Sequence, residues 1–120
     1  MDYFERKLDD MNRLTIPAEV RHEFEGGKVV LTRGFGQYLH LYTEKTWNEE
    51  MESALKGNIL DENTADLNVK FRTGKTTTLL DAKQGRITLD QHLLNYAGIA
   101  KEVVAARAGA YWRLTAKELS

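Results

Sequence analysis

Apolar and polar residues alternate along several short segments of the chain, a pattern typical of β-strands. Residues 13–16 and 86–89 place an arginine and a threonine on one face and apolar side chains on the other. Residues 28–42 and 101–114 each contain two such runs around a short glycine-containing turn. These patterns predict short strands and two β-hairpins.

The β-rich segments recur because the chain contains an internal repeat. Residues 13–41 match residues 86–114 without gaps at an offset of 73, and apolar positions stay in phase. Arg13 matches Arg86, and both arginines fall on the polar face of their strands. We therefore expect two copies of one small structural unit, each displaying an arginine to solvent or to a ligand.

Each copy predicts the same order of elements: a strand, a tight turn, a second strand, a short helix and a hairpin. The helix begins at Pro17 in the first copy and is capped by Asp90 in the second. Gly26 and Gly27 end the first helix, and Gly98 ends the second. A two-stranded hairpin is marginally stable in water, so the two copies must share a core.

The connector between the copies has helical spacing of its apolar residues. Gly57 and Asn58 interrupt this spacing, so two helices in an αα-hairpin are expected, and Thr46 and Glu49 have the spacing of a capping box at the start of the first. The predicted apolar faces contain Trp47, Met51, Ala54 and Leu55 in the first helix and Leu60, Thr64, Leu67 and Phe71 in the second. One structural unit then has three parts, residues 1–43, 44–74 and 75–120.

Composition limits the classes of protein that fit. The 120 residues include 42% hydrophobic ones, but no run approaches the roughly 18 apolar residues of a membrane-spanning helix. The chain has no cysteine, and its first residues lack the apolar region of a secretory signal. A soluble cytoplasmic protein that does not contact a membrane is expected.

The net charge of −1 argues against a generally basic nucleic-acid coat, but the charges are unevenly distributed. Residues 44–66 contain seven acids and two bases, whereas residues 70–86 contain five bases and one acid. The molecule has either an acidic face and a basic face or ordinary solvated positions in both segments.

Sequence patterns of catalysis and metal binding are not found. His22, His40 and His92 lie far apart and lack the close spacing of metal motifs, so structural or surface roles are expected. Gly74-Lys75-Thr76 resembles the end of a phosphate-binding loop, but the first glycine of that motif is missing. We predict that the chain is not an enzyme and has no catalytic residue, cofactor, metal site or small-molecule substrate.

Several strings of the sequence closely resemble the MraZ family. They are residues 8–21 (LDDMNRLTIPAEVR), residues 83–89 (KQGRITL) and residues 96–99 (YAGI), and the resemblance extends over nearly the whole chain. It includes two motifs in which an aspartate precedes an arginine across a turn. The resemblance implies an α+β fold made of two pseudo-symmetric AbrB-like swapped-hairpin β units that share a core, with a helical-hairpin insert.

The resemblance also implies a function. MraZ-like proteins assemble into rings and act as bacterial transcriptional regulators that bind short direct repeats in double-stranded DNA, upstream of the division and cell-wall gene cluster. A cytoplasmic, nucleoid-associated homo-oligomer is therefore expected. Arg13 and Arg86 match the arginines expected to enter the major groove, where the planar fork of arginine suits guanine.

Other residues carry supporting roles under this resemblance. Asp9 and Asp81 are expected to orient the two turns, and Lys7 and Lys83 to contact phosphates. Arg21 matches a DNA-contacting helix arginine of AbrB-like relatives, or is an ordinary surface residue.

Two points stay open. The second motif is one residue longer than the family spacing, so either an insertion displaces Asp81 or Ala82 replaces the acid. The alternative function is an oligomeric protein-interaction module whose basic turns bind an acidic protein partner.

Overall fold

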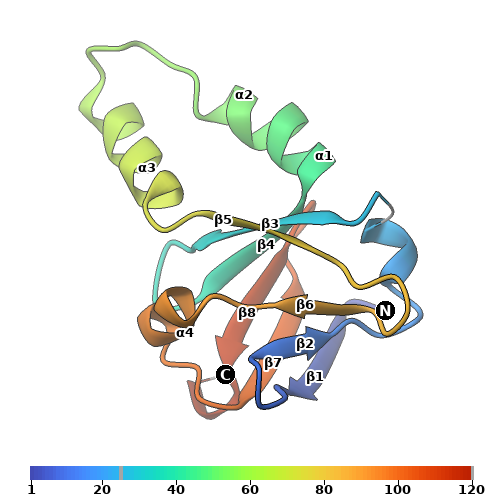
Figure 1. Cartoon of the computed structure of the whole chain (residues 1–120). Helices are drawn as coiled ribbons and strands as arrows, with labels where there is room; N and C mark the ends of the chain where they lie inside the picture. The colour runs from blue at the N-terminus through green and yellow to red at the C-terminus, as the bar shows by residue number, and fades with distance from the viewer. Residues whose placement is uncertain (25, 120) are drawn as a thin grey trace.

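The α+β arrangement of short strands and helices is seen in the computed structural model, which describes residues 1–24 and 26–119 (Figure 1). The strands are β1 (Tyr3–Lys7), β2 (Arg13–Thr15), β3 (Lys28–Arg33), β4 (Leu39–Thr43), β5 (Thr76–Leu79), β6 (Arg86–Thr88), β7 (Glu102–Arg107) and β8 (Trp112–Ala116). The helices are η1 (Arg21–Phe24), α1 (Glu44–Thr46), η2 (Trp47–Met51), α2 (Glu52–Ala54), α3 (Glu62–Arg72), α4 (Gln91–Ala97) and η3 (Lys117–Leu119).

Six strands form one antiparallel sheet in the order β1-β7-β8-β4-β3-β5. The strand β1 pairs with β7 from the other half of the chain, and β5 pairs with β3 in the same crossed manner. At the offset of 73 residues, β1 corresponds to β5, β3 to β7 and β4 to β8. Exchanging each strand for its counterpart gives the same strand order read backwards. Both halves therefore contribute to every part of the sheet, and the α+β class is confirmed.

The remaining strands, β2 and β6, form a separate two-stranded antiparallel ribbon. Leu14 lies opposite Ile87, and both are fully buried. Arg13 and Arg86 lie opposite Thr88 and Thr15 in the same register, and their side chains face away from the core. The alternation predicted for these two strands is confirmed.

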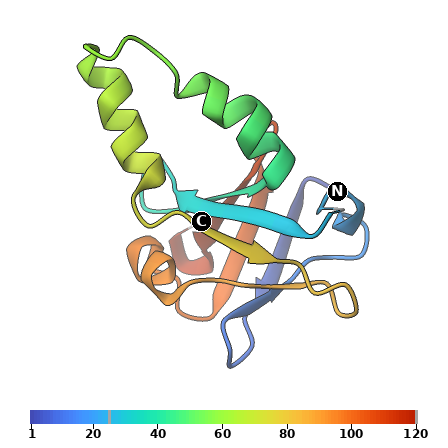
Figure 2. The ribbon, with the colours of Figure 1, turned by 45° about the horizontal axis from the view of Figure 1, so that its top comes forward.

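The main core lies between this ribbon and one face of the six-stranded sheet (Figure 2). Strands β4, β7 and β8 contribute the side chains of alternate residues, and α4 closes one side. Its central members are Leu14, Leu39, Leu41, Ile87, Leu93, Val103, Ala105 and Leu114. The core fixes the ribbon against a sheet built from both halves, so the two turns of the ribbon are held at a defined distance from each other.

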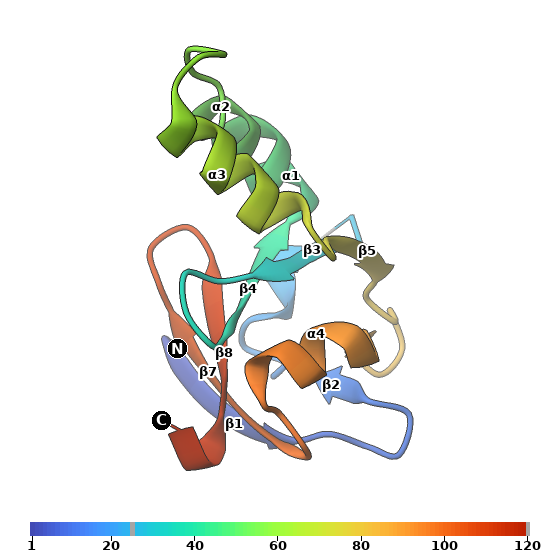
Figure 3. The same ribbon diagram turned by 90° about the vertical axis from the view of Figure 1, so that its left-hand side faces the viewer.

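The helical insert packs on the opposite face of the sheet and projects beyond it (Figure 3). A second apolar cluster joins Val30 and Tyr42 of the sheet to Trp47, Leu55 and Phe71 of the insert. We call this contact between the sheet and the insert the aromatic seam. His40 lies in it, and its ring centroid is 5.5 Å from that of Phe71 and 4.3 Å from that of Tyr111. The expected structural role of this histidine is confirmed.

The helix boundaries agree with the sequence in the second half of the chain. Asp90 caps α4 by accepting a hydrogen bond from the His92 backbone N–H, and Gly98 adopts φ 67° at its C-terminal end. A short helix also forms in the first half, but it does not begin at Pro17: residues 18–20 are turns, and the 3₁₀ helix η1 begins at Arg21. Proline supplies no cap side chain there, in contrast to Asp90.

The first helix of the insert begins three residues earlier than the predicted cap indicated. Thr43, not Thr46, is the cap, because its side-chain oxygen accepts from the Thr46 backbone N–H at 3.0 Å. Leu60 and Leu67 also differ from the prediction, since they are 89% and 40% exposed. Within the described residues, no helix is long and apolar enough to cross a membrane.

Candidate functional site

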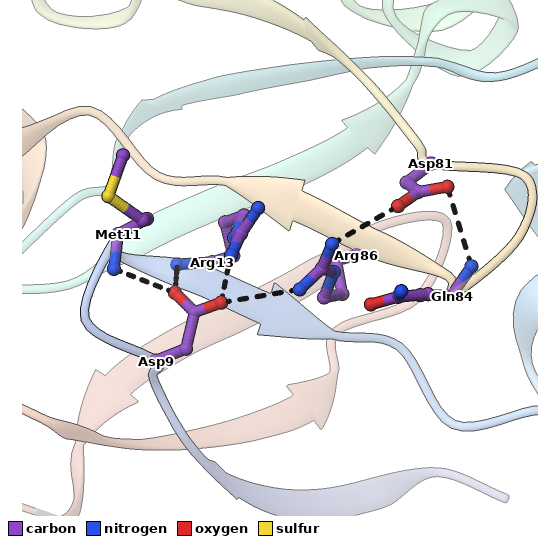
Figure 4. A network of polar contacts seen from close by, with 6 residues as sticks. All are labelled: Asp9, Met11, Arg13, Asp81, Gln84 and Arg86. Carbon is purple, nitrogen blue, oxygen red and sulfur yellow. Dashed lines mark hydrogen bonds and ion pairs between the residues drawn. The ribbon is translucent and has the colours of Figure 1, made fainter.

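The first turn of the ribbon is organised by Asp9 (Figure 4). Its Oδ1 accepts hydrogen bonds from the backbone N–H groups of Met11 and Arg13, both at 2.9 Å. Its Oδ2 accepts from Arg13 Nε at 2.7 Å. Asn12 completes the turn with φ 58°, a left-handed conformation that asparagine tolerates. Asp9 therefore fixes both the backbone of the turn and the base of the arginine side chain.

The second turn repeats this design with Asp81. Asp81 Oδ1 accepts from the backbone N–H groups of Lys83 at 2.9 Å and Gln84 at 3.4 Å, and Oδ2 lies 3.4 Å from Arg86 Nη2. Gly85 has φ 65° at the position equivalent to Asn12. These contacts favour the view that an insertion displaces Asp81, since Ala82 offers no side-chain acceptor.

The two turns meet through Asp9. Its Oδ2 lies 2.7 Å from Arg13 Nε and 3.6 Å from Arg86 Nη1, so one carboxylate contacts an arginine from each half. Asp81 contacts only Arg86 of the two. The Arg86 side chain is 22% exposed, and its buried Nε has no hydrogen-bond partner among the described residues, whereas the Arg13 side chain is 35% exposed.

The same contacts set the charge of the site. Hydrogen bonds from the Arg13 backbone N–H, and then from its side chain and the Met11 N–H, hold the pKa of Asp9 below its ordinary value. The Lys83 backbone N–H is the main cause of the lowered pKa of Asp81. Both acids are ionised at neutral pH, so they offset the charges of Arg13 and Arg86.

Arg21 braces the second turn from η1. Its Nε donates to the Ile16 carbonyl oxygen at 2.8 Å, and its side chain crosses directly over Gly85. A Cβ at residue 85 would lie 2.1 Å from Arg21 Nε. Gly85 is therefore required twice, for its positive φ and for the close approach of Arg21.

The two lysines differ in their position. Lys83 is exposed in the second turn, next to Asp81. Lys7 is exposed at the end of β1, where it lies opposite Glu102. In the part of the chain that the structure describes, no hydrogen bond or ion pair joins Lys7 to either turn.

Sequence reasoning missed a chain of three amide side chains beside the first turn. Asn12 Nδ2 donates to Gln91 Oε1 at 2.9 Å, and Gln91 Nε2 donates to Asn95 Oδ1 at 2.9 Å. Gln91 lies 79 residues from Asn12 in sequence, so no local pattern could have joined them. Among residues 1–24 and 26–119, no group of three or more histidine or acidic side chains is arranged to hold a metal ion.

The fold and the turns define a class of small α+β proteins that display acid-paired arginines from a two-stranded ribbon. Residues 1–68 match a family model described as "MraZ protein, putative antitoxin-like". With more than half of its length matched, the chain belongs to the MraZ family.

Curated relatives resemble the chain over most of its length. It is 35% identical to "Transcriptional regulator MraZ" of Clavibacter michiganensis subsp. michiganensis over 86% of this chain and 71% of the relative. The proteins of the same name from Solidesulfovibrio magneticus and Clostridium acetobutylicum are 36% and 33% identical. Those matches cover 87% and 96% of this chain, and 70% and 80% of the relatives. All three relatives are named as regulators and not as enzymes.

Proposed function

We propose that the chain is a sequence-specific DNA-binding transcriptional regulator that contacts double-stranded DNA through the β2–β6 ribbon. The observation that carries this proposal is the convergence of Arg13 and Arg86 on Asp9 at the exposed side of one ribbon. The naming of the relatives supports it. Each guanidinium has the fork that binds guanine O6 and N7 in the major groove.

The two arginines are unequal in this role. In the described contacts, Arg13 uses only its Nε, which leaves both Nη nitrogens for a base. Both Nη nitrogens of Arg86 face carboxylates, at 3.6 Å and 3.4 Å. To bind a base, Arg86 must give up its contact with Asp9 or Asp81. We therefore expect Arg13 to contribute more than Arg86 to the recognition of the DNA sequence.

Phosphate contacts by three further residues are part of the same proposal. Lys83 is exposed in the second turn and Lys7 is exposed at the end of β1, and we propose that both contact phosphates. Arg21 makes no described hydrogen bond through its two Nη nitrogens, and we propose that these contact a phosphate while Nε holds the side chain against the turn. Phosphate contacts position the protein without selecting sequence.

The wider architecture belongs to the same proposal. The crossing of β1 and β5 between the halves supports two AbrB-like swapped-hairpin units, residues 1–43 and 75–120, around a helical connector, residues 44–74. Together with the family resemblance, this supports a cytoplasmic, nucleoid-associated ring. Its repeated turns bind short direct repeats upstream of the division and cell-wall gene cluster, with avidity from several weak contacts.

A gel-shift series on repeated promoter DNA tests the proposal. We expect Arg13→Ala to weaken specific binding by at least tenfold, because a bidentate arginine–guanine contact is lost. Arg86→Ala is expected to weaken it less. Arg113→Ala is the matched control, since Arg113 lies opposite His40 and therefore on the far face of the sheet.

The salt dependence of the same binding separates the two candidate functions. DNA readout gives a steep fall of affinity with salt and preference for one repeated site. Unchanged binding by Arg13→Ala, or indifference to DNA sequence, contradicts the proposal and favours a module that binds an acidic protein partner.

A further inference from the structure

Gln91 is an exposed residue whose side-chain amide makes two hydrogen bonds beside the first turn. It is the first residue of α4, directly after the Asp90 cap. Its Oε1 accepts from Asn12 Nδ2, and its Nε2 donates to Asn95 Oδ1, both at 2.9 Å. The backbone is joined as well, since the Leu89 N–H donates to the Asn12 carbonyl oxygen at 2.9 Å. The amide is therefore fixed next to the residue that precedes Arg13.

The amide keeps unused hydrogen-bonding capacity. A glutamine side chain has two N–H donors and two acceptor lone pairs. The contacts with Asn12 and Asn95 use one acceptor site and one donor, so one of each remains. One donor and one acceptor are the groups that a glutamine offers to adenine N7 and N6 in the major groove. Because Asn12 and Asn95 already restrict the side chain, less conformational entropy is lost on binding.

The second turn has no equivalent amide. At the offset of 73, Gln91 corresponds to Ala18 and Asn12 corresponds to Gly85. The space beside Gly85 is occupied by the Arg21 side chain. The first turn thus presents an arginine with an amide beside it, whereas in the second turn the Arg21 side chain lies against the glycine that precedes Arg86.

We propose that Gln91 is a second base-reading residue, which selects an A·T base pair next to the base contacted by Arg13. This inference rests on the proposed function, and it implies that the two ends of the ribbon recognise different numbers of base pairs. The first turn selects two neighbouring base pairs, whereas the second selects one. A purely structural role of the Asn12–Gln91 contact would affect stability but not the choice of base.

Selection of bound sequences from a randomised DNA library, followed by titration of single-base variants, tests the inference on the full chain. We expect Gln91→Ala to lose about tenfold of discrimination at one base pair and to keep the salt dependence of the parent. Gln91→Glu is expected to move the preference at that position toward cytosine, whose N4 amine donates to a carboxylate. Gln37→Ala, an exposed glutamine in the β3–β4 turn, is the matched control and keeps the parent's preference.

The outcomes separate this inference from the proposed function. If the parent selects a site and Arg13→Ala abolishes selection, but Gln91→Ala and Gln91→Glu keep every base preference, Gln91 is not a reader. If the parent shows no base preference, the proposed function and this inference both fail. Thermal unfolding of each variant establishes that altered selection does not come from loss of the fold.

Discussion

Gly85 shows how one residue without a side chain supports a turn that carries an arginine. Its φ of 65° lies in the left-handed region, which costs other residues about 1–2 kcal/mol. The Arg21 side chain lies where a Cβ would be, and Arg21 is held there by the Ile16 carbonyl oxygen. A side chain at residue 85 must therefore displace Arg21 as well as strain the backbone.

We expect Gly85→Ala to lower the free energy of unfolding by about 1–2 kcal/mol more than Gly109→Ala, since a hydrogen bond of a charged donor is broken in addition. Gly109 has φ 80° but no atom within 4 Å of the position a Cβ would take. Gly109→Ala therefore measures the cost of the backbone conformation alone. Chemical denaturation measures both losses. The additional loss should disappear in an Arg21→Ala background, and equal losses for the two alanine variants would exclude the proposed clash.

The residues of the ribbon also show what a sequence can and cannot predict about the site. Alternation identified the exposed faces of β2 and β6, because Leu14 and Ile87 must be buried. The sequence could not show that Asp9 contacts an arginine from the other half of the chain, since only the pairing of β2 with β6 brings Arg86 to it. The roles of Arg13 and Arg86 in DNA binding stay predictions.

At the scale of elements, the insert is joined to the sheet by an aromatic seam around His40. The imidazole is 1% exposed, Nδ1 lies 2.8 Å from the Tyr42 hydroxyl, and Nε2 has no partner within the described residues. Burial is the main cause that lowers the pKa of His40 to about 4, and the charge of Arg113 contributes. His40 is therefore uncharged at neutral pH.

This burial makes stability depend on pH. The ordinary pKa of histidine is near 6.5, so the unfolded chain binds a proton at pH values where folded His40 stays neutral. Stability is therefore retained above pH 6.5 and falls as the pH is lowered toward 4. Between pH 7 and pH 5 we expect this residue to reduce the free energy of unfolding by about 2 kcal/mol.

Denaturant unfolding of His40→Phe at the same two pH values measures this effect, since the variant lacks the titrating group and keeps an aromatic ring. Tyr42→Phe is the control, because it removes the hydroxyl beside Nδ1 but keeps the histidine. A parent and a His40→Phe variant with the same pH dependence would show that the seam does not control acid stability.

The insert also shows why some element boundaries could not be predicted. Thr43 and Thr46 are both acceptable caps by residue type, and the end of β4 decides that Thr43 has the extended conformation a cap needs. Leu60 and Leu67 have helical spacing with Phe71, but only Phe71 reaches the seam. Contact with the sheet selects the buried face, and that contact is not local in sequence.

At the scale of the whole molecule, the crossed strands make each half depend on the other. Residues 1–43 contain β1 and β2, whose partners β7 and β6 belong to the second half. Among the described residues of this half, 1–24 and 26–43, the only strand pair is β3–β4. An isolated hairpin is marginally stable.

We therefore expect neither residues 1–43 nor residues 75–120 to fold as a monomer. Circular dichroism combined with light scattering of the separate halves checks this, with the full chain as the reference. A half that folds as a dimer agrees with the prediction, since the second copy supplies the missing strands. A folded monomeric half would show that the crossed pairs are not required.

The strand order that reads as its own reverse has a consequence for orientation. A dimer of identical units is truly two-fold symmetric and matches a palindromic site. Here both halves lie in one chain, and equivalent positions have diverged, as Asn12 from Gly85 and Gln91 from Ala18. Under the proposed function, a bound molecule has a head and a tail on the DNA. Successive copies along direct repeats then all point in the same direction.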